Sequence, residues 1–493
     1  MLGSLRQGIA VEDSTQLLIA GVVGVALGVS FAFFPATYIT ITIVAFFIVV
    51  LAIRSPQYAI IAILFLQSTY LYGDSVPTLG IGDIHIWITD MIIIGLFGLI
   101  VIRLLVDRSY KIARSPIVIP LILFLIWILF SSLRGYWYNG VDRGNMVIET
   151  RTLLYFSITL CVVALIRFEN DFQFILRWFY FLALVAAIVI LVQYGLGVEV
   201  TLLTSGKIYS ITTTGGEVVT RVQSTIGEGL VTVALIIKLI ELFVGGLQAR
   251  RIYDFLYCSI LAASLVATFN RTNWIMVGVA LLLAIFLVGS RERFRIFAWS
   301  LLMLIFISLV IITIIAIMPG SRPAGLINAG LSRFVTIFQG SSYVDPQEST
   351  LIWRNFEYTY GIPQVIKNPI AGIGLGADYR PTLSLDHPGF YGERYTHNAN
   401  LWIAMKTGLV GFALYLWFMI TFVVHALKHW KLISSKPQRI FLLGSGLTVL
   451  VCLFGQNIHP YSLQIGWIPV LSIAIGLSEK IIYNNITKME LKQ

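Results

Sequence analysis

Charged side chains are scarce in this sequence. They make up 12% of its 493 residues, whereas 58% of the residues are hydrophobic. A soluble protein carries about a quarter charged residues, so the composition excludes an ordinary soluble domain. Apolar runs near the ~20 residues that span a bilayer as a helix recur along the whole chain. The sequence therefore predicts an all-α polytopic membrane protein.

Cysteine and metal-binding patterns are also missing. Cys161, Cys258 and Cys452 lie far apart in apolar segments and form no C-x-x-C pair, so we expect neither a disulfide framework nor a metal cluster. The six histidines show no H-E-x-x-H spacing, and no phosphate-binding loop occurs in a suitable context. We therefore expect no metal and no cofactor.

The net charge of +10 would suggest a nucleic-acid partner in a soluble chain. In a membrane protein the same charges anchor loops and set topology, so we expect no nucleic acid. Membrane lipids are the expected surroundings instead.

The apolar runs predict about fourteen transmembrane helices (twelve to fourteen). The first is interpreted as a retained helix, because it lacks a convincing small-residue cleavage site. The predicted spans are 16–34, 37–53, 57–72, 86–106, 116–133, 152–167, 173–196, 229–246, 252–269, 272–289, 295–318, 398–425, 439–457 and 463–482.

Basic residues then decide the orientation. With the N-terminus in the cytoplasm, most loop lysines and arginines fall on the cytoplasmic side, as the positive-inside rule requires. Both termini are then cytoplasmic, and the long loops face outward. The predicted divisions are a bundle at 1–318, an outer loop at 319–397, and a second bundle with a cytoplasmic tail at 398–493. Two stretches of the outer loop, 320–340 and 349–369, read as amphipathic helices. The Asn368-Pro369 pair is expected to stop the second of them.

His397 is the leading candidate for chemistry. It lies at the outer end of the predicted span 398–425, beside Asn398. Imidazole titrates near neutral pH and can accept a proton from a hydroxyl group. The alternative is a histidine that caps a helix or reaches to the membrane interface.

Three arginines are candidates for binding an anion at the same face. Arg271 occupies a very short outer turn, where a positive charge opposes the topology bias and needs a partner or a role. Arg221 precedes a span, and Arg354 lies on the second amphipathic stretch. Guanidinium groups match phosphate oxygens. The alternative for Arg221 and Arg271 is pairing with Glu217 or Glu228.

Other ionisable residues have weaker patterns. Lys238 and Glu241 are expected to neutralise each other, and Lys406 to pair or to extend toward the interface. Asp90 is interpreted as a helix cap or as the partner of an arginine. His387 reads as a surface residue, and His459 has a place near the same cavity without an assigned role.

Several sequence motifs together resemble those of a known protein family. The stretch "KNPIAGIGLG" contains Gly374, and "HNANLWIAMKTGLVGFALYL" follows it and begins at His397 and Asn398. Together they resemble the signature of the O-antigen ligase and O-antigen polymerase superfamily. "WRNFEYTYGIPQVI", "FNRTNWI" and "TRVQSTIGEGLV" resemble its arginine-bearing segments, although Gly227-Glu228 replaces the usual Pro-Asn. The resemblance covers roughly residues 210–460.

The resemblance implies a GT-C-like, metal-independent, inverting glycosyltransferase in the bacterial cytoplasmic membrane. Its donor is a glycan on undecaprenyl diphosphate, presented at the outer face, and its acceptor is a glycan or lipid A-core. It further implies His397 as general base or as the group that orients the acceptor hydroxyl, and Arg221 and Arg271 as diphosphate ligands. Arg354 either joins them as a diphosphate ligand or braces the outer loop, and Asn398 and Gly374 have supporting roles. A regulator of chain length is a further expected partner.

Polymerase and ligase activities stay open, because both use the same donor. From other classes, a secondary transporter or glycan flippase and a non-catalytic assembly protein are the alternatives. Transporters concentrate charges and broken helices at mid-membrane, often in repeated halves. This chain instead gathers its notable polar residues at one face and shows no internal repeat.

Overall fold

The computed structural model describes residues 55–68, 78–81, 84–107, 115–166, 170–200, 202, 207–212, 218–223, 227–244, 251–318, 320–338, 350–381 and 393–490. Within these ranges the chain is mostly helical, as predicted. The α-helices are α3 Pro56–Ser68, α4 Ile88–Val106, α5 Val118–Asn139, α6 Arg143–Leu154, α7 Ile158–Leu165, α8 Asn170–Leu196, α9 Gly227–Val244, α10 Arg251–Ala267, α11 Arg271–Leu287, α12 Ser290–Ile317, α13 Arg322–Phe338, α14 Thr350–Lys367, α15 Ala399–His429, α16 Lys436–Gly455 and α17 Ile468–Glu490. Short 3-10 turns are η1 Tyr155–Ser157, η3 Trp430–Leu432 and η4 Tyr461–Leu463.

Two antiparallel β-hairpins add to the all-α prediction. The first pairs β1 (Thr78–Ile81) with β2 (Ile84–Trp87), and the second pairs β3 (Lys207–Thr212) with β4 (Val218–Gln223). Each strand has only four or six residues, so neither hairpin contains a run of about 20 apolar residues such as marks a membrane span. The β3–β4 hairpin packs its Ile208 and Val222 against α8, α10 and α13.

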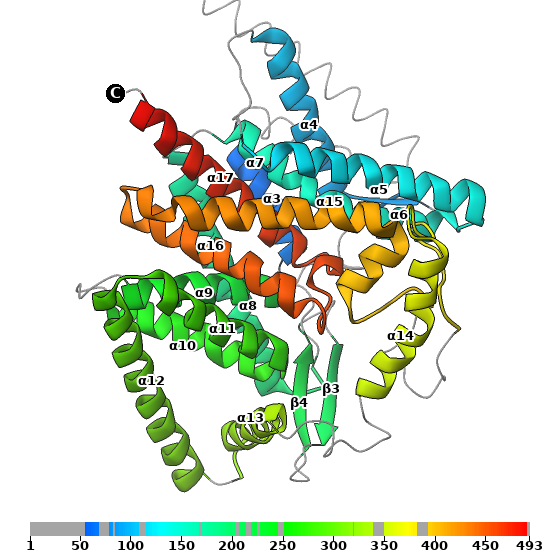
Figure 1. Cartoon of the computed structure of the whole chain (residues 1–493). Helices are drawn as coiled ribbons and strands as arrows, with labels where there is room; N and C mark the ends of the chain where they lie inside the picture. Colours follow the sequence, from blue (N-terminus) through cyan, green and yellow to red (C-terminus); the bar gives the residue numbers. More distant parts are fainter. Residues whose placement is uncertain are drawn as a thin grey trace, which may run out of the picture.

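The described helices form one bundle with a continuous apolar core. Figure 1 shows α5, α15, α16, α9, α10 and α11 running along one another. The hairpin β3–β4 and α14 lie at one end of this bundle, which corresponds to the predicted outer end (Figure 1).

Six described helical stretches are long and apolar enough to cross a membrane: Ile88–Val106, Val118–Asn139, Arg143–Leu165, Asn170–Leu196, Ala399–Leu432 and Lys436–Gly455. Three shorter apolar helices are Pro56–Leu66, Ile252–Ala267 and Arg271–Leu287. One predicted boundary is wrong: the span placed at 152–167 begins at Arg143, because α6, η1 and α7 join end to end. The predicted spans 16–34 and 37–53 lie outside the described residues, so the count of fourteen stays a prediction.

Both predicted amphipathic helices of the 319–397 segment form, as α13 and α14. The second begins at Thr350 and ends at Lys367, before the Asn368-Pro369 pair that was expected to stop it. Proline lacks the N–H that continues a helix and restricts the residue before it. α14 packs against α15, so the segment joins the bundle directly.

The glycine-rich stretch after α14 packs its backbone closely against neighbouring helices. Gly372, Gly374 and Gly376 all have positive φ angles, which favour glycine. The N–H groups of Ile373 and Gly374 donate to the carbonyl oxygens of Met405 and Lys406 at 2.9 Å each. These bonds hold the loop against α15 just before Gly408, where the helix is interrupted by a φ of 72°.

Gly374 approaches α5 more closely than a side chain allows. A Cβ atom at this position would overlap the Cα atom of Gly135, and the φ angle is +94°. The backbone of Gly374 therefore packs directly against α5 and α15, in a place where a larger residue does not fit.

Gly374→Ala is expected to destabilise the fold by about 2 kcal/mol or more, since it adds left-handed strain of about 1–3 kcal/mol to the overlap with Gly135. Gly278→Ala is the matched control, because nothing lies within 4 Å of the added Cβ on α11. Reversible unfolding in detergent measures both. A Gly374→Ala protein as stable as Gly278→Ala would contradict this role of the loop.

Candidate active site

His397 lies against a buried carboxylate. Its Nδ1 is 2.8 Å from Oε1 of Glu357, and its backbone N–H donates to Oε2 of the same residue at 2.8 Å. The Thr396 hydroxyl donates to that Oε2 at 3.0 Å. Glu357 is 2% exposed. An ionised carboxylate only accepts hydrogen bonds, so His397 carries its proton on Nδ1 and presents Nε2 as the basic nitrogen.

This arrangement depends on how α14 meets the start of α15. Asn398 caps α15, because its Oδ1 accepts the N–H of Leu401 at 3.0 Å. Its Nδ2 donates to the Tyr358 hydroxyl at 3.0 Å. Asn398 therefore joins the helix that carries Glu357 to the helix that follows His397.

Arg354 lies one turn before Glu357 on α14. Its Nη2 donates to the Ile458 carbonyl at 3.1 Å, and its Nε is buried without a hydrogen bond. No carboxylate of the described residues forms an ion pair with it. Burial lowers the pKa of Arg354, and the nearby Glu357 carboxylate partly offsets this. The guanidinium group is thus partly desolvated and has unused donor capacity.

Arg221 and Arg271 meet at the turn between α10 and α11. Arg221 on β4 donates from Nε to the Thr268 carbonyl at 3.2 Å. This bond fixes the tight turn that ends with the N-cap Asn270 and places Arg271 first in α11. Burial lowers the pKa of Arg271, and the charges of Arg221 and Arg354 lower it further. The three predicted arginines are therefore close enough to act on one another.

His459 belongs to the same cluster. It lies in the loop between α16 and α17, where its Nε2 is 3.0 Å from Nε2 of Gln464 and 3.5 Å from Nδ2 of Asn270. Burial lowers the pKa of His459 to about 3, the hydrogen bond from Gln464 partly offsets this, and the charges of His397, Arg221 and Arg354 contribute. The imidazole is therefore neutral at any physiological pH.

Glu228, one of the expected alternative partners for the arginines, lies close enough to Arg221 for their charges to attract each other. This buried carboxylate accepts from Nδ2 of Asn270 at 2.7 Å and from Nδ2 of Asn273. Glu217, the other expected partner, lies outside the described residues, as does His387.

Sequence reasoning missed Glu357, the residue that orients His397. The available signal was local: Glu357 is the only acidic residue in the segment Thr350–Lys367, and it follows Arg354 by three positions on the same helix. The distance of 40 residues to His397 hid the pairing, which only the packing of α14 on α15 brings about.

The structure shows which partners Asp90 and Lys238 have. Asp90 fills both expected roles: Oδ2 accepts the Trp87 N–H at the start of α4 and lies 3.1 Å from Nε of Arg151. Lys238 pairs with Glu241 at 2.7 Å, as expected.

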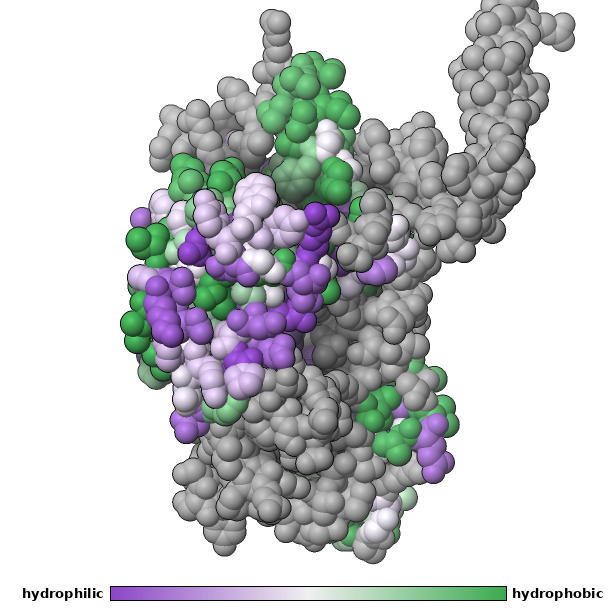
Figure 2. Space-filling model, turned by 90° about the vertical axis from the view of Figure 1, so that its right-hand side faces the viewer, coloured by the Kyte–Doolittle hydropathy of each residue, from purple (hydrophilic) through white to green (hydrophobic). Residues whose placement is uncertain are grey.

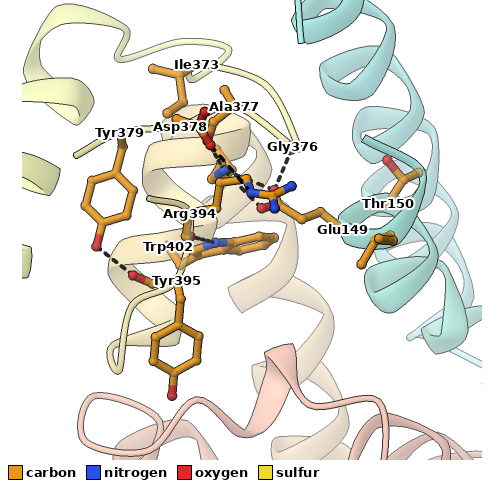
Figure 3. A network of polar contacts seen from close by, with 12 residues as sticks. Glu149, Thr150, Ile373, Gly376, Ala377, Asp378, Tyr379, Arg394, Tyr395 and Trp402 are labelled. Atoms are coloured by element: carbon orange, nitrogen blue, oxygen red, sulfur yellow. Dashed lines mark hydrogen bonds and ion pairs between the residues drawn. The ribbon is translucent and has the colours of Figure 1, made fainter. Parts of the chain in front are cut away.

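Lys406 pairs with Glu149 on α6 at 3.0 Å, and its ammonium group also donates to the Ala377 carbonyl. Figure 3 shows Glu149 beside Gly376, with the Arg394–Asp378 pair next to it. This network fastens the glycine loop to α6 and to the first part of α15. It braces the element that carries His397 and stands apart from the arginine cluster.

The site combines an imidazole that is oriented by a carboxylate with a cluster of positively charged groups. The guanidinium groups of Arg221, Arg271 and Arg354 lie near the N-terminus of α11, whose partial positive charge also favours anions. Hydrophilic residues gather on part of this end of the molecule, which faces the viewer in Figure 2. The described residues hold no group of three or more metal-ligating side chains. Such an arrangement can bind a diphosphate and take a proton from a hydroxyl group.

The fold and these side chains define a multi-helix membrane protein with a candidate site at one end of its bundle. Residues 256–416 match the family model of the O-antigen ligase. This match confirms the resemblance to the O-antigen ligase and O-antigen polymerase superfamily, and it indicates a membrane enzyme of glycosyltransferase type. The matched region contains Arg271, Arg354, Gly374, His397 and Asn398. No curated protein matches this chain.

The low pKa of His459 predicts a pH dependence of stability. The folded protein binds a proton here only near pH 3, whereas the unfolded chain binds one near pH 6.5. Between these values the unfolded state holds more protons, so stability falls as the pH falls. From pH 7 to pH 5 this contribution costs about 2 kcal/mol. We expect His459→Gln to abolish this contribution, so that the variant loses about 2 kcal/mol less stability than the wild type between pH 7 and pH 5.

Reversible unfolding in detergent at pH 7 and pH 5 checks this. His85→Gln, at an exposed histidine of β2, is the control and should keep the pH dependence of the wild type. Equal pH dependence in all three proteins would contradict the burial of a neutral His459.

Proposed function

We propose that this protein is an inverting glycosyltransferase that needs no metal ion. It moves an oligo- or polysaccharide from undecaprenyl diphosphate to a glycan or lipid A-core acceptor at the outer face of the cytoplasmic membrane. The observation that carries the proposal is the pairing of His397 with Glu357 beside three clustered arginines. A hydroxyl acceptor requires a base that takes its proton, and a diphosphate leaving group requires cations that stabilise its negative charge.

The reaction uses His397 to activate the acceptor. The acceptor hydroxyl oxygen attacks the anomeric carbon of the donor from the face opposite the diphosphate, which inverts the configuration. As the new C–O bond forms, the hydroxyl proton passes to Nε2 of His397. The bond from the anomeric carbon to the diphosphate oxygen breaks, and its electron pair leaves with the diphosphate. Glu357 stabilises the imidazolium that results, because its carboxylate accepts the Nδ1–H.

The arginines act on the leaving group. Negative charge on the diphosphate oxygen that leaves grows as the glycosidic bond breaks, and fixed guanidinium groups stabilise it most strongly in a site with little water. Arg354 is partly desolvated and has a buried Nε that lacks a partner. These residues thereby take over the neutralising role that a metal ion plays in other transferases.

Glu357→Gln is expected to lower kcat about 10- to 100-fold, because an amide cannot fix the His397 tautomer or stabilise imidazolium. The KM for the lipid-linked donor should change little, since Glu357 faces His397. Steady-state kinetics with the purified full chain measures both, and the kcat–pH profile should shift. Glu241→Gln, at a carboxylate paired with Lys238 within α9, is the control. An unchanged kcat in Glu357→Gln would contradict the claim that Glu357 orients His397 as the general base.

Arg354→Gln is expected to reduce kcat/KM about 10- to 100-fold, through loss of a charge-assisted hydrogen bond of about 1.5–3 kcal/mol. Arg354→Lys should recover part of this, because the charge returns without the planar fork. Transfer assays over a range of donor concentrations separate these values. If both variants kept wild-type kcat/KM, Arg354 would have no role in binding the diphosphate.

A gel profile of lipid-linked and surface glycans tests the reaction class. A deletion strain is complemented with the wild type or with His397→Ala at equal expression. Loss of polymer with single repeat units on the surface lipid indicates polymerase activity. Full-length polymer stranded on the carrier indicates ligase activity. A normal glycan profile with His397→Ala would contradict the proposed mechanism. It would favour the alternatives of a transporter or a non-catalytic assembly protein.

A further inference from the structure

His397 lies in a segment that regular secondary structure does not hold. Residues 395–398 form neither helix nor strand, and α15 begins only at Ala399. A catalytic group must be held within about 0.5 Å of its productive position. The position of the imidazole therefore depends on the contacts that other residues make with this irregular backbone.

One carbonyl group two residues before His397 accepts two hydrogen bonds. The Tyr395 carbonyl accepts from the Tyr379 hydroxyl at 2.9 Å and from Nη2 of Arg380 at 3.3 Å. In addition, Nε of Arg380 donates to the Tyr379 hydroxyl at 3.2 Å. The three bonds form a closed ring of contacts, in which the guanidinium fork and the phenol hold the same backbone atom.

The two carbonyl groups before that of Tyr395 are also bonded. The Glu393 carbonyl accepts from the backbone N–H of Tyr379 at 3.0 Å, and the Arg394 carbonyl accepts from Nε1 of Trp402 at 3.0 Å. Figure 3 shows Tyr379 pointing toward Tyr395, and Trp402 beside Arg394. Three successive carbonyl groups are therefore fixed just before the general base.

Arg380 is buried and has no carboxylate partner. It is 5% exposed, it forms no ion pair with a carboxylate of the described residues, and its Nη1 is buried without a hydrogen bond. Burying a guanidinium without a paired carboxylate is costly, which indicates that its remaining contacts have a role. Its Cζ also lies 6.0 Å from the centroid of the Phe356 ring, next to Glu357 on α14. Arg380 thus joins the chain before His397 to the helix that carries the carboxylate.

The Tyr379 hydroxyl is suited to link these groups because it stays protonated. Burial, and after it the negative charge of Glu357, raise the pKa of Tyr379 to about 12, although the charge of Arg380 partly offsets this. A protonated phenol donates one hydrogen bond and can accept another. The hydroxyl can therefore accept from Arg380 while it donates to the Tyr395 carbonyl.

We propose that Tyr379 and Arg380 are positioning residues for the transfer reaction, which hold the backbone before His397 so that Nε2 points at the acceptor hydroxyl. The inference rests on the proposed function and adds residues outside the base and the arginine cluster. Glu357 fixes the imidazole through its Nδ1. Tyr379 and Arg380 fix the backbone from which the imidazole extends.

The test compares Tyr379→Phe with a matched control, Tyr257→Phe on α10. The Tyr257 hydroxyl also donates to a backbone carbonyl, that of Tyr180, at 2.8 Å, so both changes remove one bond of the same kind. The release of undecaprenyl diphosphate from a glycan on this carrier is measured with the full chain in nanodiscs, over a range of donor concentrations. Both changes are also made in the His397→Ala chain.

We expect Tyr379→Phe to lower kcat about 10- to 100-fold, because a displacement of about 1 Å costs up to that much. The KM for the donor should stay within about twofold, since the arginine cluster is intact. In the His397→Ala chain the same change should lower release less than about twofold, because the base that it positions is already absent. Tyr257→Phe should match its parent chain in both cases. Arg380→Lys should lower kcat as Tyr379→Phe does, because an ammonium group lacks the planar fork that makes both bonds.

A kcat of Tyr379→Phe equal to that of Tyr257→Phe would overturn the proposal. An equal loss from Tyr379→Phe with and without His397 would overturn it too, because a change that only weakens the fold lowers the residual rate as well. Failure of the proposed function has a different signature: His397→Ala alone releases undecaprenyl diphosphate at the wild-type rate.

Discussion

The hydrogen bonds that Glu357 accepts are the interaction on which the site depends. One buried carboxylate binds the ring of His397, its backbone N–H and the hydroxyl of Thr396. Burying an ionised carboxylate is costly unless several donors compensate it, and these three donors all come from the segment just before α15. The carboxylate therefore holds α14, the end of the 393–398 segment and the imidazole as one unit.

The surrounding structure keeps that unit in place through close backbone packing of a glycine-rich loop, where a side chain would not fit. The glycine-rich loop lies against α5 and α15, and the Lys406–Glu149 pair fastens it to α6. The loop between α16 and α17 closes the other side, where Ile458 accepts a hydrogen bond from Arg354 and His459 stays neutral. A neutral imidazole adds polarity beside the three arginines without adding charge to them.

Much of this site could be predicted from local patterns. His397 and Arg271 were proposed because each stands at the edge of an apolar run, where a polar residue requires an explanation. Arg354 was proposed because it lies on an amphipathic stretch of the same outer segment. The end of α14 was predicted at Asn368-Pro369, although Pro363 is accommodated inside the same helix. Glu357 could not be assigned in this way, because its role arises from a contact across 40 residues. Lys406 was also undecided, because the partner on α6 is remote in sequence. The two hairpins could not be predicted from hydrophobic length, because strands of four or six residues are far shorter than an apolar run that spans a membrane.

The most direct measurement separates donor binding from transfer in His397→Ala. The purified full chain in nanodiscs is given a glycan on undecaprenyl diphosphate, and both bound donor and released undecaprenyl diphosphate are quantified. The account predicts donor affinity within about twofold of the wild type, because the arginines are intact, and a release rate lowered about 10²- to 10⁴-fold. Release at the wild-type rate from this variant would contradict the assignment of His397 as the base.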